Sequence, residues 1–199
     1  MENLEQIAEE IRTCRRCDLY RVKTNYVPGS GSEKAEVVFV GEAPGREEDL
    51  KGEPFVGNAG KLLNEMLSKI GLTRNDVFIC NVLKCRPPNN RDPAPEEVEA
   101  CGRYLERQLE VIRPKIIVCL GRFAANYIFN LFGLEFTSIS KVKGKVFEAE
   151  AWGGKVKIVP IYHPAAVLYR PQLKKEYEEN FRVVGKLLEK KQPTLFDYL

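Results

Sequence analysis

The sequence predicts an α/β protein, a three-layer α/β/α sandwich around a central, mainly parallel sheet of four strands. Short apolar runs such as residues 37–41 alternate with segments of helical periodicity along the chain. Strands that read as continuous apolar runs are typical of a sheet that helices cover on both faces. The chain has 199 residues, of which 44% are hydrophobic, so it can bury one core. We therefore predict a single domain over residues 1–190.

The first half of the chain supplies two helices and two strands. Apolar residues recur at helical spacing over residues 4–11, and a glycine-containing basic loop leads to the strand of residues 37–41. A second helical pattern covers residues 62–70 and ends at Gly71, since glycine commonly follows the last turn of a helix. Residues 76–83 are predicted to form the second strand.

The second half continues this alternation. Pro95 opens a helix that Pro114 stops, and residues 115–121 supply the third strand. Three elements remain: a helix over residues 122–132, a hairpin over residues 144–162 whose second arm enters the sheet, and a charged helix over residues 172–190.

Charge and the N-terminal segment narrow the classes of protein. The N-terminus is acidic and amphipathic, and no apolar run approaches the roughly 20 residues that span a bilayer. We therefore expect a cytoplasmic monomer that does not contact a membrane. The net charge of +3 permits binding to nucleic acid without requiring it.

The six cysteines fall into two groups. In a cytoplasmic protein they are not expected to form a disulfide framework, because thiols are kept reduced there. Four of them have the spacing C-x2-C-x67-C-x15-C, which leaves zinc, an iron–sulfur cluster and a redox CxxC motif open. Cys80 and Cys119 lie inside predicted strands and are expected to be buried as small apolar residues. The four candidate ligands are Cys14, Cys17, Cys85 and Cys101.

Three polar residues follow three of the predicted strands directly. Ligands of open α/β sheets collect outside the carboxyl ends of the strands, and Glu42, Asn81 and His163 stand there. We expect these side chains to converge. His163 is the single histidine of the chain, so any imidazole chemistry must use it.

Four motifs, "GEAPGREED", "PFVGNAG", "NVLKCRPPNNRDP" and "HPAAVL", together with the cysteine pattern, resemble the family 4 uracil-DNA glycosylases, the iron–sulfur type of thermophiles. The resemblance covers residues 4–188. It implies a DNA repair enzyme that flips uracil out of single- or double-stranded DNA and hydrolyses its N-glycosidic bond, leaving an abasic site. It also implies a 4Fe-4S cluster on Cys14, Cys17, Cys85 and Cys101 that acts as a structural clamp.

The resemblance assigns roles to the residues of the uracil site. The amide of Asn81 can meet both the N3–H donor and the O4 acceptor of uracil, Phe55 would stack on the base, and His163 would hydrogen-bond O2. Glu42 is our first choice for orienting the attacking water, with Glu48 and Asp49 as alternatives. The uracil-binding residues implied are Gly41, Glu42, Ala43, Phe55, Asn81 and His163.

The chain departs from the family 1 enzymes in the motif "GEAPG". Ala43 stands where family 1 has an aspartate that activates water, and Gly45 stands where it has a tyrosine that excludes thymine. The sequence therefore leaves both the general base and the means of excluding thymine open.

The segment after His163 resembles the family's loop that enters the duplex. Leu168 or Tyr169 would fill the vacated stack, and Arg170 would contact phosphate. Six further basic residues are candidates for phosphate contacts or for a solvated basic surface: Lys84, Arg86, Arg91, Lys141, Lys143 and Lys145.

Residues 191–199 form a C-terminal tail. The tail fits the pattern of sliding-clamp (PCNA) ligands at Gln192, Leu195, Tyr198 and Leu199, although Leu199 occupies a position that is more often aromatic. This match also indicates an archaeal source, because bacterial clamps bind a different motif.

Two other functions remain open. One is a non-catalytic iron–sulfur repair factor that docks on DNA, although such a protein has no use for Asn81, Phe55 and His163 together. The other is a glycosylase for a different deaminated base. A nucleotide-binding protein is disfavoured, because "GNAGKL" and "GSGSEK" lack the spacing of the phosphate-binding loops.

Overall fold

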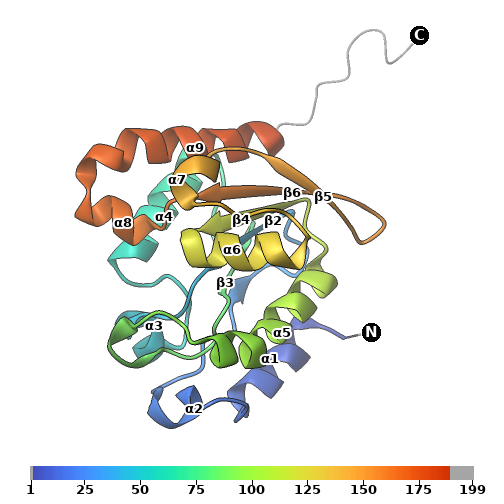
Figure 1. The fold of residues 1–199 in the computed structure, drawn as a ribbon, viewed down its shortest axis with the longest axis vertical. Helices are drawn as coiled ribbons and strands as arrows, with labels where there is room; N and C mark the ends of the chain where they lie inside the picture. Colours follow the sequence, from blue (N-terminus) through green and yellow to red (C-terminus); the bar gives the residue numbers. More distant parts are fainter. Residues whose placement is uncertain (1, 189–199) are drawn as a thin grey trace, which may run out of the picture.

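The computed structural model describes residues 2–188, which form one central sheet with helices on both faces (Figure 1). The strand order is β1-β3-β2-β4-β6-β5. Strands β3, β2, β4 and β6 are parallel, and the two edge strands pair with them in antiparallel fashion. The strands are β1 (Ser30–Gly31), β2 (Val37–Gly41), β3 (Phe78–Asn81), β4 (Ile116–Leu120), β5 (Phe147–Ala151) and β6 (Gly154–Ile161).

The predicted α/β/α sandwich is confirmed, and its four parallel strands form the centre of the sheet. The structure adds the two edge strands. Strand β5 is the first arm of the predicted hairpin, and β1 is a two-residue strand inside the segment predicted as a loop. A strand this short has no periodicity that a sequence pattern can detect.

Helices cover the two faces of the sheet in separate groups. Helices α5 and α6 pack on one face, and α4, α8 and α9 pack on the other. The longer helices are α1 (Leu4–Arg12), α4 (Asn58–Lys69), α5 (Pro95–Ile112), α6 (Arg122–Leu131) and α9 (Lys174–Leu188). The shorter ones are α2 (Leu19–Val22), α3 (Arg46–Lys51), α7 (Ile139–Val142) and α8 (Pro164–Tyr169), with 3₁₀ turns at Pro88–Asn90 and Pro171–Leu173.

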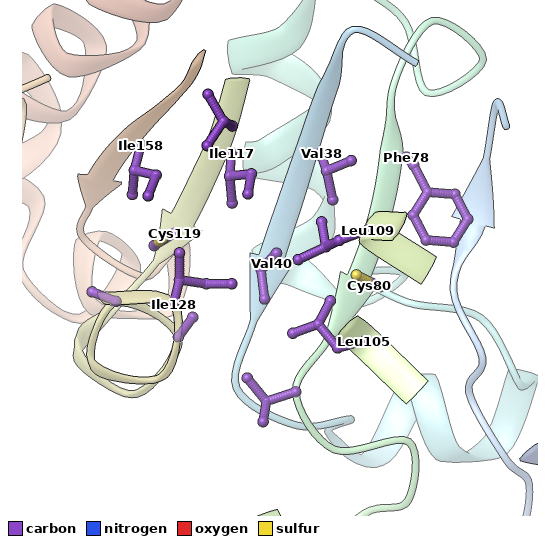
Figure 2. Packing of buried hydrophobic residues seen from close by; sticks show 14 of the residues in the cluster. Val38, Val40, Phe78, Cys80, Leu105, Leu109, Ile117, Cys119, Ile128 and Ile158 are labelled. Atoms are coloured by element: carbon purple, nitrogen blue, oxygen red, sulfur yellow. The ribbon is translucent and has the colours of Figure 1, made fainter. Parts of the chain in front are cut away.

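Side chains of the inner strands alternate between these two layers, as the period of a β-strand requires. Val38 and Val40 of β2 face α5 and α6 (Figure 2), whereas Phe39 of the same strand packs against the layer that contains α4 and α9. Cys80 and Cys119 are completely buried in the first layer, as predicted. Because both faces are covered, the polar groups at the strand ends are the part of the sheet that is open to a ligand.

The segment after His163 differs from the prediction. It was expected to be a loop, but it forms α8 and then a 3₁₀ turn before α9 begins at Lys174. Pro164 occupies the first turn of α8, where its missing N–H and fixed φ are compatible with a helix. Among residues 2–188 no helix is long and apolar enough to cross a membrane.

A third, smaller core lies between α1, α5 and the cysteine-bearing loops. Ile7 and Ile11 of α1 and Tyr104 of α5 are buried there with Leu83, which follows β3. The cysteines lie at the edge of this cluster. Strand β3 therefore leads from the end of the sheet into the cysteine-bearing region within a few residues.

Candidate functional site

A cavity of about 340 Å³ opens at the carboxyl ends of β2, β3 and β6. Glu42, Asn81 and His163 all line it, so the structure brings together the three residues that were expected to converge at the ends of these strands. Further lining residues are Ala43, Pro44, Gly45, Glu48, Phe55, Ala59, Pro87, Asn90, Arg91, Ala165 and Tyr169.

Gly41 lies behind the cavity and lets its walls approach each other. A Cβ atom at this position would lie 2.3 Å from Asn81 Oδ1 and 2.6 Å from Phe55 Cζ, so a larger residue would displace both side chains. The backbone of residues 41–42 also accepts hydrogen bonds from the Val82 and Leu83 amides at 2.9 and 3.0 Å. The ends of β2 and β3 are thus held together where Asn81 stands.

Asn81 presents an unpaired acceptor. The residue is 1% exposed, and its Oδ1 has no hydrogen-bond partner among the described residues. An unpaired buried acceptor costs about 1–3 kcal/mol, so this atom would gain from a donor on a ligand. Its backbone carbonyl accepts a hydrogen bond of 2.8 Å from Lys84 Nζ, which ties down the main chain beneath the amide.

Phe55 is held in a strained backbone conformation. It has φ of 51°, in the left-handed region that few non-glycine residues adopt. Arg74 donates hydrogen bonds to the carbonyls of Pro54 and Phe55 at 2.6 and 3.1 Å, and Gly60 leaves room for the Phe55 carbonyl. The phenyl ring lies against the His163 ring with centroids 5.6 Å apart. Sequence reasoning did not identify Arg74, since a single arginine in a loop carries no signal.

The imidazole ring of His163 is neutral, and a hydrogen bond fixes its orientation. Burial lowers its pKa to about 4, and the nearby Glu48 carboxylate opposes this shift only in part. Its Nδ1 accepts a hydrogen bond of 3.2 Å from the Ala165 amide, so in the neutral ring Nε2 carries the proton. The residue thereby offers one N–H donor in a poorly hydrated site.

Of the three candidate carboxylates, Glu42 and Glu48 line the cavity. Burial, followed by the charge of Asp92, raises the pKa of Glu42, while Arg122 opposes the shift. Glu48 is fixed, because its Oε1 accepts hydrogen bonds from the amides of Val56 and Gly57 at 2.9 and 3.0 Å.

Asp49 was an alternative for orienting the water, and the structure contradicts this. It is 4% exposed and does not line the cavity. Its Oδ1 accepts hydrogen bonds from the Thr24 and Asn25 amides at 2.9 and 3.3 Å, so its carboxylate is bound up in fixing that loop.

The predicted DNA-contacting residues have different environments. Tyr169 is 87% exposed at the rim of the cavity, and Leu168, 46% exposed, lines a neighbouring groove between α4 and α8. Arg170 is exposed at the end of α8. The prediction for Lys84 was wrong, because it is buried inside the protein rather than placed on a DNA-facing surface. Lys143 is paired with Glu176 at 3.0 Å.

Cys14, Cys17, Cys85 and Cys101 line one pocket. Three tyrosines share its walls, and the hydroxyl of one of them, Tyr26, donates a hydrogen bond of 2.6 Å to the Cys14 carbonyl. The Lys84 amide donates a hydrogen bond of 3.2 Å to Cys101 Sγ. Burial raises the pKa of Cys101 to about 11 and that of Cys85 further still. Cys85 and Cys101 are therefore protonated at neutral pH unless a cation stabilises their thiolates.

The clamp-binding residues Gln192, Leu195, Tyr198 and Leu199 lie outside residues 2–188, which the structure describes. The division between a domain of residues 1–190 and a tail also falls there.

Comparisons with known proteins agree with this geometry. The family model of the uracil DNA glycosylase superfamily matches residues 28–183. The chain is 74% identical to a type-4 uracil-DNA glycosylase of Archaeoglobus fulgidus over the full length of both chains. It is 50% identical to a type-4 uracil-DNA glycosylase of Saccharolobus solfataricus, covering 100% of this chain and 93% of the relative. A type-4 uracil-DNA glycosylase of Thermotoga maritima is 47% identical over 84% of each chain.

Proposed function

This chain belongs to the uracil-DNA glycosylase superfamily and is an enzyme that excises uracil from DNA in repair, and we propose that the cavity at the ends of β2, β3 and β6 binds the flipped base. The observation that carries the proposal is the unpaired, buried Oδ1 of Asn81 beside an oriented, neutral His163. Enzymes that act on a base must take it out of the stack into such a pocket.

Asn81 reads the edge of uracil in this account. Its Oδ1 accepts from N3–H, and its amide nitrogen donates to O4. Cytosine offers an acceptor at N3 and a donor at the exocyclic amine, so each would face a like partner. Each buried group left unpaired costs about 1–3 kcal/mol, which is enough to reject cytosine when two are affected.

His163 stabilises the leaving group. When the bond between C1′ and N1 breaks, the electron pair remains on the base, and the negative charge spreads to O2. The Nε2–H of the neutral imidazole donates to O2, and one such donor in a dry site contributes about 3–4 kcal/mol. Because burial lowers the pKa of His163 to about 4, the ring remains a neutral donor at neutral pH.

Glu42 orients the water that attacks C1′. It lines the cavity without the backbone hydrogen bonds that fix Glu48. The oxygen of the water bonds to the electron-poor C1′, and an ionised Glu42 accepts a proton from this water. The water oxygen thereby becomes the new hydroxyl group of the abasic sugar.

The remaining walls hold the base and the DNA. Gly41 and Ala43 allow close approach, and Phe55 stacks on the flipped base, held from behind by Arg74. Tyr169 or Leu168 enters the vacated stack, since both are exposed beside the cavity, and Arg170 contacts phosphate. Arg91 at the cavity rim is a further phosphate candidate.

The cysteine pocket holds a 4Fe-4S cluster. Four thiols share one pocket, and burial raises the pKa values of Cys17, Cys85 and Cys101, so a polycationic group that keeps these thiols ionised would suit the pocket. When bound, the cluster supplies a cross-link between α1, α5 and the loop after β3.

Three further features belong to the proposal. The protein is a monomer with one catalytic domain over residues 1–190. Its tail of residues 191–199 binds a sliding clamp of the PCNA type through Gln192, Leu195, Tyr198 and Leu199. A pull-down with an archaeal clamp tests this tail, and replacement of Leu195 and Tyr198 by alanine should abolish retention.

Alkali-induced cleavage of a labelled single-stranded oligonucleotide with one uracil tests the site. Thymine, hypoxanthine and undamaged oligonucleotides serve as controls, and Asn81→Ala is compared with the wild type. Strand breaks at uracil alone that are lost in Asn81→Ala support the proposal. Full activity of Asn81→Ala would contradict the role of Asn81, and breaks at hypoxanthine would identify a broader glycosylase.

A further inference from the structure

We propose that Arg74 is a positioning residue that keeps Phe55 in its left-handed backbone conformation and thereby sets the face on which a flipped base stacks. Because the ring matters only if the cavity binds uracil, this role rests on the proposed function. Arg74 does not line the cavity itself, so it acts on the base only through Phe55.

The guanidinium group of Arg74 is committed to uncharged oxygen atoms. Its Nη2 donates to the Pro54 carbonyl at 2.6 Å and to Ser30 Oγ at 3.5 Å. Its Nη1 donates to the Phe55 carbonyl at 3.1 Å and to Asn64 Oδ1 at 3.3 Å. The planar fork of an arginine can hold two acceptors at once, and here it spans two consecutive backbone carbonyls. The group therefore serves as a backbone clamp.

The loop that carries Arg74 is fixed by its own hydrogen bonds. It connects α4 to β3, and Asp76 Oδ2 accepts from the amide and the hydroxyl of Thr73 at 2.7 and 2.6 Å. Arg74 follows Thr73 directly. The guanidinium group thus reaches the turn from a constrained loop, which suits a role in positioning.

The turn of residues 54–57 is held from two sides by opposite charges. Arg74 takes two of its carbonyls, and Glu48 Oε1 accepts from the amides of Val56 and Gly57 at 2.9 and 3.0 Å. Between them Phe55 has φ of 51°. A strained conformation of this kind persists only where the surrounding contacts over-determine it. Without Arg74 the turn would be held from its amide side alone.

Phe55 is the member of this turn that lines the cavity. Its ring lies beside that of His163, with centroids 5.6 Å apart. The direction of the Cα–Cβ bond follows the backbone dihedral angles, so a relaxed φ would move the ring from this place. Loss of Arg74 should therefore weaken the binding of the base and leave contacts to the DNA backbone unchanged.

Arg74→Met tests this role, because methionine keeps part of the stem and removes the donors. The inhibition constant of free uracil is measured against excision from a labelled oligonucleotide, beside the affinity for abasic-site DNA. The wild type, Arg74→Met, Phe55→Ala and the double variant are compared, all as full chains. Arg113→Met is the matched control, since Arg113 also donates to a backbone carbonyl, that of Glu110 at 3.2 Å, and does not line the cavity.

We expect Arg74→Met to raise the inhibition constant of uracil about tenfold. If Arg74 acts through the ring, the double variant should differ from Phe55→Ala by no more than about twofold. The affinity for abasic-site DNA should stay the same, because this DNA has no base to stack, and Arg113→Met should behave as the wild type.

Two results would overturn the proposal. One is an unchanged inhibition constant in Arg74→Met. The other is a loss in Arg74→Met that is equally large with and without the Phe55 ring, because a general loss of stability would have that effect.

A second variant covers the case in which Arg74→Met does not fold. Arg74→Lys keeps the positive charge but not the fork that spans two carbonyls, so it should also weaken inhibition by uracil. Inhibition at the wild-type level in Arg74→Lys would overturn the proposal. Failures of the underlying function are recognised separately. An unchanged inhibition constant in Phe55→Ala refutes the stacking role, and a wild type that leaves uracil in DNA refutes the glycosylase site.

Discussion

The uracil cavity and the cysteine pocket lie at the two ends of one short segment, residues 81–85, but they are constructed on opposite principles. The cavity is open, and Asn81 Oδ1 in its wall has no hydrogen-bond partner among residues 2–188. The cysteine pocket is enclosed by tyrosines and apolar side chains, and burial raises the pKa values of the Cys85 and Cys101 thiols, which are poorly ionised without a cation. The cavity is thus preorganised for a ligand that leaves, and the pocket for one that stays.

Substitutions in the two regions should therefore affect different properties, the reaction in the cavity and stability in the cysteine pocket. The unpaired Oδ1 of Asn81 and the strained backbone of Phe55 destabilise the folded protein, and a bound substrate would offset this cost. Replacing residues of the cavity should therefore alter the reaction more than the stability of the fold. Residues of the cysteine pocket would gain their stabilisation from the proposed cluster, so replacing them should alter the fold first. Four variants test this separation, beginning with the largest expected effect.

Cys101→Ala should have the largest effect, and it should act on stability. Loss of one of the four proposed ligands should remove the proposed cluster, and the binding free energy of a structural metal site contributes directly to folding. We expect loss of iron, sulfide and the visible absorption band, together with a large fall in Tm. Cys119→Ala is the control, since Cys119 is buried away from the pocket. A Cys101→Ala protein with the Tm of the wild type would contradict the structural role.

His163→Leu should act on the reaction with little change in Tm. Loss of the single donor to O2 should lower the single-turnover rate constant by about 10²–10³. The affinity for abasic-site DNA should be retained, because this DNA carries no base with which His163 could form a hydrogen bond. A fall in Tm comparable to that of Cys101→Ala would remove the distinction between the two regions.

Phe55→Ala should weaken the binding of the flipped base by about 1–3 kcal/mol through loss of stacking. Affinity for uracil-containing DNA, measured at low temperature where excision is slow, should fall. Phe123→Ala provides the control, because Phe123 lines a separate groove between α5 and α6. Equal losses in the two variants would show that the effect is not specific to the cavity.

Glu42→Gln should have the smallest effect at neutral pH and a clear effect on the pH profile. Burial raises the pKa of Glu42, so the carboxylate is ionised above this value and becomes protonated as the pH falls through it. Activity of the wild type should therefore decline before His163 is protonated near pH 4. In Glu42→Gln this decline should disappear and leave a lower, flat profile down to about pH 4. An unchanged acid limb would assign it to another group.

Much of the fold could be predicted from sequence because its signals are local. The apolar runs at residues 37–41 and 115–121 predicted β2 and β4, and Pro95 marked the first residue of α5. The convergence of Glu42 and Asn81 also followed from a general rule about strand ends. Helix α8 was missed, although Pro164 stands at a position where proline commonly opens a helix.

The supporting contacts of the site could not be predicted, because they join residues far apart in the sequence. Lys84 lies in a polar segment and so was interpreted as a surface cation, whereas its partner Gln108 is 24 positions away. Asp49 had the charge expected of a base, but it binds the amides of Thr24 and Asn25. Only the three-dimensional structure distinguishes an acid that faces the cavity from one that fixes a loop.

In the proposed reaction, His163 stabilises the departing base as an anion. A direct test compares oligonucleotides that contain uracil with oligonucleotides that contain 5-fluorouracil. The fluorine atom is small, and because it withdraws electrons, the anion of the departing nucleobase is more stable and needs less help from the protein. Single-turnover rates are measured for the wild type and His163→Leu. If His163 stabilises the anion, the variant should lose much less activity on 5-fluorouracil than on uracil. Equal losses on the two substrates would contradict the claim and assign His163 to binding or positioning instead.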